Sequence, residues 1–349
     1  LVHTAPAFGE DDYQAGAQFG LPFFLTVDSE GRIAQRAGIE PYAGQWIKEA
    51  DKPIIRDLKE SGRLLHHDRY RHNYPFCWRC DQPLVYYASE SWFVRTTARR
   101  QELIDLNQTI GWHPPHIRDG RFGKWLENVV DWALSRKRYW GTPLPVWRCD
   151  ACNHTQAIHS FAELFEKAGR QAPDDLYDRR KFDPHRPFVD ADADEPFVWP
   201  CEVCESGTMG RVAEVIDAWF DAGSMSFAQH HYPFENRDLV EKQIQFPADF
   251  IAEAVDQTRG WFYTLHVLGA LLFDSGADQN CSVLGHIPDE QGRKMSKRLG
   301  NDVEPLAVSP DTGADALRWY FCINNPEINS RFSGRLVREA AQGFLIPLG

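Results

Sequence analysis

The chain has 349 residues, enough for two or three domains, and 43% hydrophobic with 25% charged residues is typical of a globular protein rather than a disordered or fibrous one. Its formal net charge of −12 argues against a general polyanion-binding protein, although local basic clusters can still bind RNA. The most apolar run, 262–273, is too short to span a bilayer, and there is no signal peptide, so we expect a cytoplasmic protein without membrane association. The first residue is not methionine and the last ones read as part of a helix, which indicates an internal piece of a longer protein.

The first half of the chain reads as a small α+β region, 1–52, followed by a second region, 53–147. In the second region we predict a helix at 55–61, strands at 84–87 and 92–95, and helices at 97–106 and 124–134. Residues 148–212 are bounded by cysteine pairs and contain a linker rich in proline and aspartate, so they are expected to form an insertion.

The second half changes to strand–helix alternation, which favours a parallel sheet flanked by helices and therefore an α/β fold. Within residues 213–330 the expected elements are a strand at 249–254, a helix at 258–273, a strand at 282–287 and a helix at 314–322. Residues 331–349 are expected to begin a further helical region.

Six of the eight cysteines form three C-x-x-C pairs. Two pairs bound the predicted insertion: Cys149/Cys152 and Cys201/Cys204. Four thiolates satisfy a tetrahedral zinc ion, whereas thioredoxin-like chemistry needs a strand before the pair and a helix after it, which neither pair has in sequence. We therefore predict a structural Zn²⁺ site in a zinc-ribbon-like insertion. The third pair, Cys77/Cys80, either binds a second metal with partners upstream of Leu1 or binds none.

Polar side chains crowd the end of the predicted strand 249–254, where Glu253, Asp256, Gln257 and Trp261 open the next helix. Ligands of parallel α/β sheets bind at this edge, beside the positive end of a helix. The plainer interpretation is that Asp256, or Thr258 nearby, only caps the helix.

Residues 293–301, Arg-Lys-Met-Ser-Lys-Arg-Leu-Gly-Asn, form a glycine-flanked loop that carries Lys294 and Lys297. Mobile ammonium groups on such a loop can stabilise the negative charge that builds on a leaving triphosphate oxygen. A solvated basic turn is the plainer interpretation. The string resembles the KMSKS loop of class I aminoacyl-tRNA synthetases, with Arg298 in place of the last serine.

Further segments resemble the same class. Residues 132–145 and 216–223 resemble runs shared by its isoleucine, valine and leucine enzymes, with Ala222 in place of a serine. Residues 256–262, Asp-Gln-Thr-Arg-Gly-Trp-Phe, resemble the isoleucine enzymes, whereas the other two carry different residues there.

The resemblance assigns roles to individual residues. It implies that Lys294 and Lys297 stabilise the leaving pyrophosphate and that Lys297 binds ATP. The remaining implied contacts are Glu253 and Asp256 to the adenylate, and Gln257 and Trp261 to the amino-acid side chain.

The start of the chain, His-Thr-Ala-Pro at 3–6 and Gly-Glu-Asp-Asp-Tyr at 9–13, resembles the editing pocket of this family. By resemblance His3 lines the pocket and Asp12 binds the amino group of a mischarged aminoacyl end. An acidic turn that caps a helix is the plainer interpretation.

Taken together, the resemblance implies a monomeric ligase that activates L-isoleucine with ATP and Mg²⁺, transfers it to tRNA(Ile) and edits mischarged valine. It assigns 1–52 to the end of the editing domain, 53–147 to the catalytic domain, 148–212 to the zinc insertion, 213–330 to the second Rossmann half and 331–349 to the tRNA-stem region. The first Rossmann half would lie outside this chain, so the chain alone is expected to be inactive. The alternatives are a valyl-tRNA synthetase and a non-catalytic, zinc-stabilised RNA-binding module.

Overall fold

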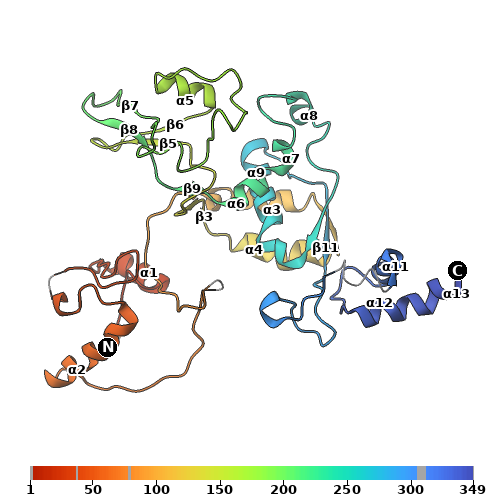
Figure 1. Cartoon of the computed structure of the whole chain (residues 1–349), viewed down its shortest axis with the longest axis horizontal. Helices are drawn as coiled ribbons and strands as arrows, with labels where there is room; N and C mark the ends of the chain where they lie inside the picture. Colours follow the sequence, from red (N-terminus) through yellow and green to blue (C-terminus); the bar gives the residue numbers. More distant parts are fainter. Residues whose placement is uncertain (1–2, 37, 78–79, 305–311, 349) are drawn as a thin grey trace. The chain divides into compact units, whose positions relative to one another are not determined.

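The computed structural model describes residues 3–36, 38–77, 80–304 and 312–348 (Figure 1). The chain divides into two compact units, Leu1–Glu90 and Ser91–Gly349. No helix in the described part of the chain is long and apolar enough to cross a membrane.

The first unit contains two helices, α1 (Glu10–Phe19) and α2 (Ile47–Glu60), and the 3-10 helix η1 (Glu40–Tyr42). The helix predicted at 55–61 begins earlier in the structure: α2 starts at Ile47 and continues through Pro53, although a proline usually disrupts a helix interior. The strand predicted at 84–87 is wrong: these residues follow an isolated Phe76–Pro83 bridge and form no strand themselves.

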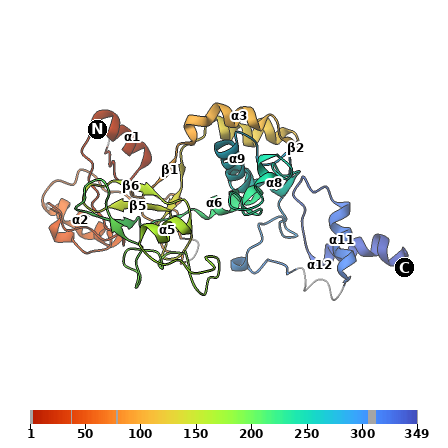
Figure 2. The same cartoon turned by 90° about the horizontal axis from the view of Figure 1, so that it is seen from above.

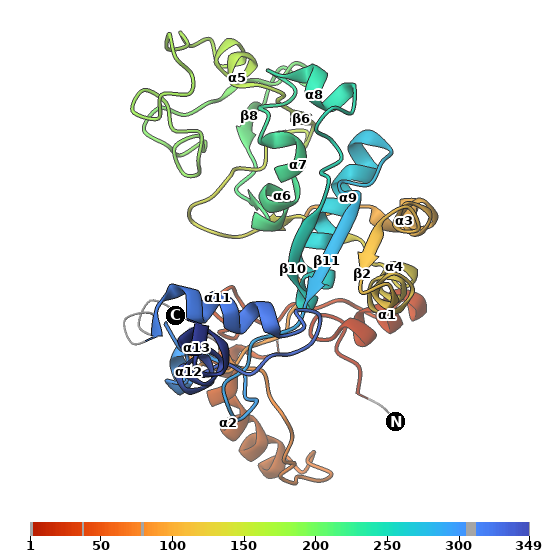
Figure 3. The same ribbon diagram turned by 90° about the vertical axis from the view of Figure 1, so that its right-hand side faces the viewer.

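A three-stranded parallel sheet forms the centre of the second unit, in the order β10-β11-β2. Its strands, seen side by side in Figure 3, are β2 (Gly111–His113), β10 (Ile251–Ala254) and β11 (Asn280–Leu284). The crossover between β10 and β11 is α9 (Trp261–Phe273), an almost wholly apolar helix whose middle is buried. The predicted α/β class is confirmed.

Helix α3 (Arg100–Asn107) packs beside α9 and makes a buried polar contact with it. The His266 imidazole of α9 is 1% exposed, and its Nε2 lies 2.7 Å from the Leu103 carbonyl oxygen. Burial lowers the pKa of His266 to about 4, so the ring is neutral in the core.

The helix predicted at 124–134 is wrong in its second half. Helix α4 ends at Glu127, and Trp132–Ala133 form strand β3, antiparallel to β1 (Phe93–Val94). Asp131 stabilises this arrangement because its Oδ1 accepts hydrogen bonds from the backbone and hydroxyl of Thr97, at 3.0 and 2.6 Å. The pairing partner is far away in sequence, so local periodicity could not reveal it. The neighbouring elements are η2 (Thr96–Arg99), the π-helix η3 (Arg118–Phe122) and α4 (Gly123–Glu127).

The insertion is a four-stranded antiparallel sheet in the order β6-β5-β8-β7, with helix α5 beside it (Figure 2). Its elements are β5 (Val146–Cys149), β6 (Thr155–Ala157), α5 (Phe161–Lys167), β7 (Trp199–Pro200) and β8 (Thr208–Arg211). It has its own core, which includes Trp147, Phe165, Phe197 and Met209.

The other elements connect these parts. A short antiparallel pair, β4 (Ser135–Arg136) with β9 (Val215–Ile216), leads into the helices after the insertion. These are α6 (Ala218–Gly223), α7 (Met225–Ala228), α8 (Arg237–Glu241) and the 3-10 helix η4 (Val255–Arg259). The last part holds η5 (Lys297–Leu299), α11 (Ala314–Ile323), α12 (Gly334–Ala340), the π-helix η6 (Ala341–Leu345) and α13 (Ile346–Leu348), around Ala316, Tyr320, Phe332 and Val337.

Candidate functional site

One of the predicted site segments lies at an edge of the parallel sheet. Strands β10 and β11 run in the same direction, so their carboxyl ends, Ala254 and Leu284, lie side by side. Glu253 on β10 is exposed, and Asp256 lies in η4 directly after it. His286, two residues past β11, has its Nδ1 3.9 Å from Asp256 Oδ1. The polar cluster of 253–261 and His286, which lies between β11 and the lysine loop, therefore share this edge.

Gln257 caps helix α9, a role that the sequence interpretation gave to Thr258 or Asp256. The Gln257 Oε1 accepts a hydrogen bond of 2.9 Å from the Trp261 backbone N–H, while its Nε2 donates to Asp256 Oδ2 at 3.2 Å. Thr258 is fully buried and bonds instead to the Val255 carbonyl and to Arg121. The capping prediction is therefore corrected. The side chain of Gln257 is long enough to pass over Gly260 and reach the first N–H of the helix, that of Trp261.

Trp261 is half-buried and fixed in orientation. Its indole Nε1 donates a hydrogen bond of 2.8 Å to the carbonyl oxygen of Ala222 in α6. Helix α6 approaches α9 closely because Gly223 lies against Thr264, where an added Cβ would be 2.9 Å from the backbone. The flat face of the indole, rather than its N–H, is thus left for any ligand.

The lysine loop is organised by a carboxylate that the sequence analysis did not single out. Asp289 is 5% exposed, and its Oδ1 accepts hydrogen bonds from the backbone N–H groups of Gln291 and Arg293, at 3.1 and 2.7 Å. Its Oδ2 accepts from Asn301 Nδ2 and from Arg293 Nε, at 2.9 and 2.8 Å. These contacts, the one from Asn301 above all, lower the pKa of Asp289 to about 2.

Asn301 closes the other end of the loop. Its Nδ2 also donates to the Lys294 carbonyl at 3.2 Å, and its Oδ1 accepts from the Ser296 N–H at 2.9 Å. Ser296 in turn caps the short helix η5, which ends at Gly300 in the left-handed conformation (φ 61°). The backbone is thereby fixed without use of the lysine side chains. Lys294 and Lys297 are exposed, and neither pairs with an acid in the described parts of the chain.

A buried aspartate, Asp217, joins two segments that sequence resemblance had linked only by their order. Its Oδ2 accepts from Arg136 Nη2 at 2.7 Å and from Trp132 Nε1 at 3.3 Å. The guanidinium of Arg136 is therefore engaged in this ion pair. Another basic side chain, Arg118, pairs with Asp119 at 3.0 Å.

The four cysteines of the insertion converge as predicted. Their sulfur atoms all lie within 4.8 Å of one another, with Cys149 to Cys204 at 3.6 Å and Cys152 to Cys201 at 3.8 Å. A tetrahedron with Zn–S distances of about 2.3 Å has edges of about 3.8 Å, so the donor set fits a tetrahedral metal. Strands do precede both pairs, contrary to the sequence interpretation, but a turn and not a helix follows each pair, which still argues against a thioredoxin-like site.

Backbone N–H groups lie within hydrogen-bonding distance of two of these sulfur atoms, those of Cys149 and Cys201. The N–H groups of Ala151 and Cys152 lie 3.4 Å from Cys149 Sγ. Hydrogen bonds from Ser206 lower the pKa of the Cys204 thiol to about 6. A Cβ on Gly207 would be 2.4 Å from Cys149 Sγ, so glycine is required beside the cluster.

The residue that follows each of the three C-x-x-C pairs adopts the same conformation. In each, the residue after the second cysteine has a positive φ and donates its N–H to the carbonyl of the first cysteine: Asn153 to Cys149, Glu205 to Cys201 and Asp81 to Cys77. Asp81 in the first unit therefore shares its conformation and its hydrogen bond with Asn153 and Glu205 beside the four-cysteine cluster. No further cysteine, histidine or acid completes a cluster around Cys77 and Cys80 within the described residues.

The two residues expected at an editing pocket are not brought into contact. Asp12 lies in the first turn of α1 with its Oδ2 beside Gly9, and it makes no capping hydrogen bond. His3 is exposed, and no hydrogen bond joins it to Asp12 in the described chain. Their roles stay predictions.

Comparison with known protein families identifies the family of this chain. The family described as tRNA synthetases class I (I, L, M and V) matches residues 13–332. The chain belongs to this family. The predicted resemblance is thereby confirmed, and with it the fold class of the catalytic domain.

Among curated relatives, the isoleucine–tRNA ligase of Dehalococcoides mccartyi is 51% identical over 350 residues, which covers 100% of this chain and 33% of that protein. The isoleucine–tRNA ligases of Thermus thermophilus and Clostridium novyi are each 49% identical, covering 100% of this chain and 32% of theirs. This synthetase chain thus spans about a third of the length of these relatives. A solved Mycobacterium tuberculosis methionyl-tRNA synthetase in complex with methionyl-adenylate matches with a TM-score of 0.49 at 15% identity, covering 96% of this chain and 55% of that one.

Proposed function

We propose that this chain is the central part of an isoleucine–tRNA ligase, which activates L-isoleucine with ATP and transfers it to tRNA(Ile). The observation that supports the proposal is the polar edge of the sheet, where Glu253 and Asp256 lie near His286, together with the lysine loop further along the chain, which leaves Lys294 and Lys297 exposed. The identity of about half of all positions to isoleucine–tRNA ligases supports the choice of amino acid.

In the proposed reaction the carboxylate of isoleucine attacks the α-phosphorus of ATP, which enters with Mg²⁺, and pyrophosphate leaves. The ammonium groups of Lys294 and Lys297 stabilise the charge on that leaving group, with Lys297 the main contributor. The terminal ribose hydroxyl of tRNA(Ile) then attacks the adenylate carbonyl, and AMP leaves. Catalysis needs positioning and charge stabilisation but no covalent enzyme intermediate.

The pocket residues are assigned by the same logic. Glu253 and Asp256 contact the adenylate, while the Trp261 indole face and the aliphatic part of Gln257 pack against the branched side chain. Because Gln257 and Trp261 use their polar atoms on the protein, they offer isoleucine an apolar wall.

The remaining assignments are structural or lie in the first unit. We propose Zn²⁺ as the metal at Cys149, Cys152, Cys201 and Cys204, where it would hold the insertion together without taking part in the reaction. The turn at Cys77 and Cys80 would hold a second zinc with cysteines from another part of the complete protein. His3 and Asp12 belong to an editing site for valine-charged tRNA, and the protein is a cytoplasmic monomer.

The test is amino-acid-dependent exchange between ATP and pyrophosphate, with this chain inside the complete protein. We expect exchange with isoleucine to exceed exchange with valine and leucine, and the isolated 349 residues to give none. Exchange that favours valine would keep the reaction and reject the isoleucine assignment. Absence of exchange with all three would favour the zinc-stabilised RNA-binding module.

A further inference from the structure

An apolar pocket lies in the second unit, away from the residues of the proposed active site. Its volume is about 360 Å³, and its 13 lining residues come from three separate segments. They belong to the loop before β5, to the insertion with its linker, and to the turn before α8: Pro143, Pro145, Trp147, Ile158, His159, Ser160, Phe161, Leu164, Tyr177, Pro184, Val189, His231 and Phe234.

The floor of the pocket is a part of the core of the insertion. Trp147, Leu164 and Val189 are 3%, 4% and 1% exposed. The indole N–H of Trp147 points away to the Phe197 carbonyl, at 2.8 Å, so its face toward the pocket is apolar. This floor is rigid and presents no unsatisfied polar atom of Trp147 to a ligand.

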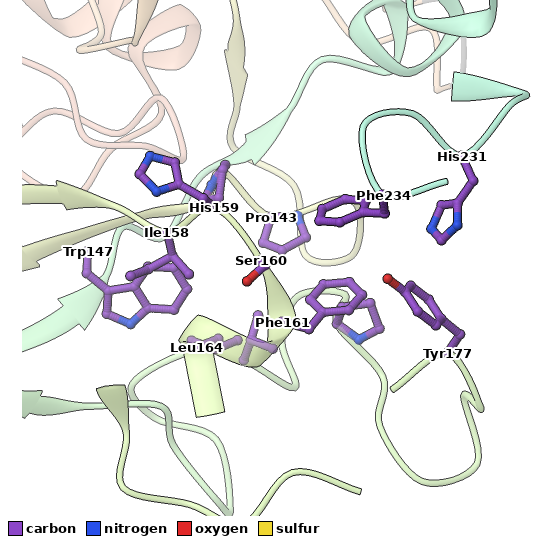
Figure 4. Close-up of a pocket in the computed structure, with 13 residues that line it drawn as sticks. Pro143, Trp147, Ile158, His159, Ser160, Phe161, Leu164, Tyr177, His231 and Phe234 are labelled. Carbon is purple, nitrogen blue, oxygen red and sulfur yellow. The ribbon is translucent and has the colours of Figure 1, made fainter. Parts of the chain in front are cut away.

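The rim of the pocket is a set of exposed aromatic rings. Tyr177 and Phe234 both border the pocket, and their side chains remain 57% and 56% exposed. Tyr177 contacts Phe161 at 6.0 Å and His231 at 5.0 Å between ring centroids, and His231 contacts Phe234 at 5.7 Å. Figure 4 shows these four rings gathered around one space, with the Tyr177 hydroxyl directed into it.

His231 is held in this rim by its backbone. Its φ is 56°, a left-handed conformation that non-glycine residues rarely adopt, and its carbonyl accepts hydrogen bonds from Phe234 and Glu235. Such a conformation costs energy and persists only where the surroundings determine it. The turn thus fixes the imidazole edge-on to Tyr177.

The lining contains no aspartate, glutamate, lysine or arginine. Its two histidines are already engaged, His159 with Glu163 and His231 with Glu235, each at 3.4 Å. A charged ligand would lose its hydration there without gaining an unengaged partner of opposite charge, which is unfavourable. A flat ring, by contrast, can pack against the proline and aromatic faces, and a cavity of about 150 Å³ is already large enough to bind benzene in a small protein.

From these observations we propose that this pocket is a binding site for an uncharged planar aromatic molecule of one or two fused rings, with a single polar group that bonds to the Tyr177 hydroxyl. Because the lining comes from three segments, the bound ring also holds the insertion against the turn 229–236. This site is independent of the proposed aminoacylation.

Indole is a suitable probe, added to the whole chain and detected by saturation-transfer NMR and by thermal unfolding. We expect saturable binding and a rise in the unfolding temperature, since a ligand that binds only the folded state stabilises it. Phe234→Ala should raise the dissociation constant at least about tenfold. The matched control is Phe188→Ala, which removes a ring that is 54% exposed but does not line the pocket, and it should leave binding unchanged.

Two further comparisons make the result decisive. Val189→Phe places a ring into the pocket from its floor and should abolish indole binding; if this variant fails to fold, the Phe234→Ala and Phe188→Ala pair still decides. Indole-3-carboxylate should bind at least about tenfold more weakly than indole. Undetectable binding to the wild type, equal loss in both alanine variants, or equal affinity for the charged analogue would overturn the proposal.

Discussion

The lysine loop and the four-cysteine cluster are both built from irregular backbone, yet they are fixed in opposite ways. In the cluster the four cysteine sulfur atoms lie within 4.8 Å of one another. The atoms that would bind a metal are therefore the same atoms that would hold this region together. In the loop, Asp289 and Asn301 bond to the backbone and to each other, and the two lysines stay exposed. A side chain that binds a structural metal must be immobile. A lysine that stabilises a leaving group needs a fixed backbone and a mobile ammonium group.

Metal removal should have the largest effect and should act on one region only. Because structural zinc contributes on the order of 10 kcal/mol to the folding of small domains, we expect chelation to unfold the insertion. Hydrogen exchange should then become fast in β5 and β8 while β10 and β11 stay protected. Unchanged protection of β5 after the metal has been removed would show that the cluster is not what holds the insertion together.

The lysine side chain should matter for rate rather than for structure. In the complete protein, Lys297→Ala is expected to slow adenylate formation by roughly 100-fold or more, with little effect on isoleucine binding. Pre-steady-state ATP consumption and equilibrium binding measure the two quantities. Lys242→Ala, which removes an exposed lysine paired with Asp238 on α8, is the control. Equal losses of rate and binding for Lys297→Ala would reject its assignment to the leaving group.

Gly207 tests how closely the backbone approaches the cluster. Since an added Cβ would be 2.4 Å from Cys149 Sγ, Gly207→Ala should weaken metal binding at least about tenfold. Competition with a chromogenic chelator gives the affinity. Gly120→Ala is the matched control, because nothing lies within 4 Å of a Cβ at that position. The same affinity in both variants would mean that the cluster adjusts more freely than its geometry indicates.

The smallest expected effect is the pH response of the lysine loop. The pKa of Asp289 is about 2 in the folded chain against an ordinary 3.8, so its stabilising effect is present above about pH 4 and is lost as the pH falls through 2. Asn301→Ala removes the largest cause and should raise the pKa of Asp289 toward 3.8. A carbon-detected NMR titration of Asp289 checks this value. A midpoint that is the same in wild type and variant would contradict the bond from Asn301.

Much of the candidate site could be read from the sequence because its signals are local. Spacing alone identified the four cysteines, and the strings 256–262 and 293–301 identified the family that comparison confirms. Parallel strands and the apolar helix between them were also predicted, since strand–helix alternation leaves few other arrangements.

Some of the errors arose where distant residues decide the local structure. Trp132–Ala133 form strand β3 because they pair with Phe93–Val94. The cap of α9 is a local error: Gln257, not Asp256 or Thr258, reaches the Trp261 N–H. Asp289 and Asn301 went unnoticed because they lie 12 positions apart and have meaning only as a bonded pair. The turn Asp289-Glu290-Gln291-Gly292 before the lysines was the available signal.

The sequence by itself determined the family, the class of fold and the four cysteines that converge, since each is signalled by short local motifs. The tertiary structure decided which carboxylate orders the lysine loop, which side chain caps α9, how Trp261 is oriented, and that three segments enclose an apolar pocket. The cap of α9 depends on which nearby side chain reaches the helix end, and the other features on hydrogen bonds and packing between residues farther apart, which no local pattern specifies.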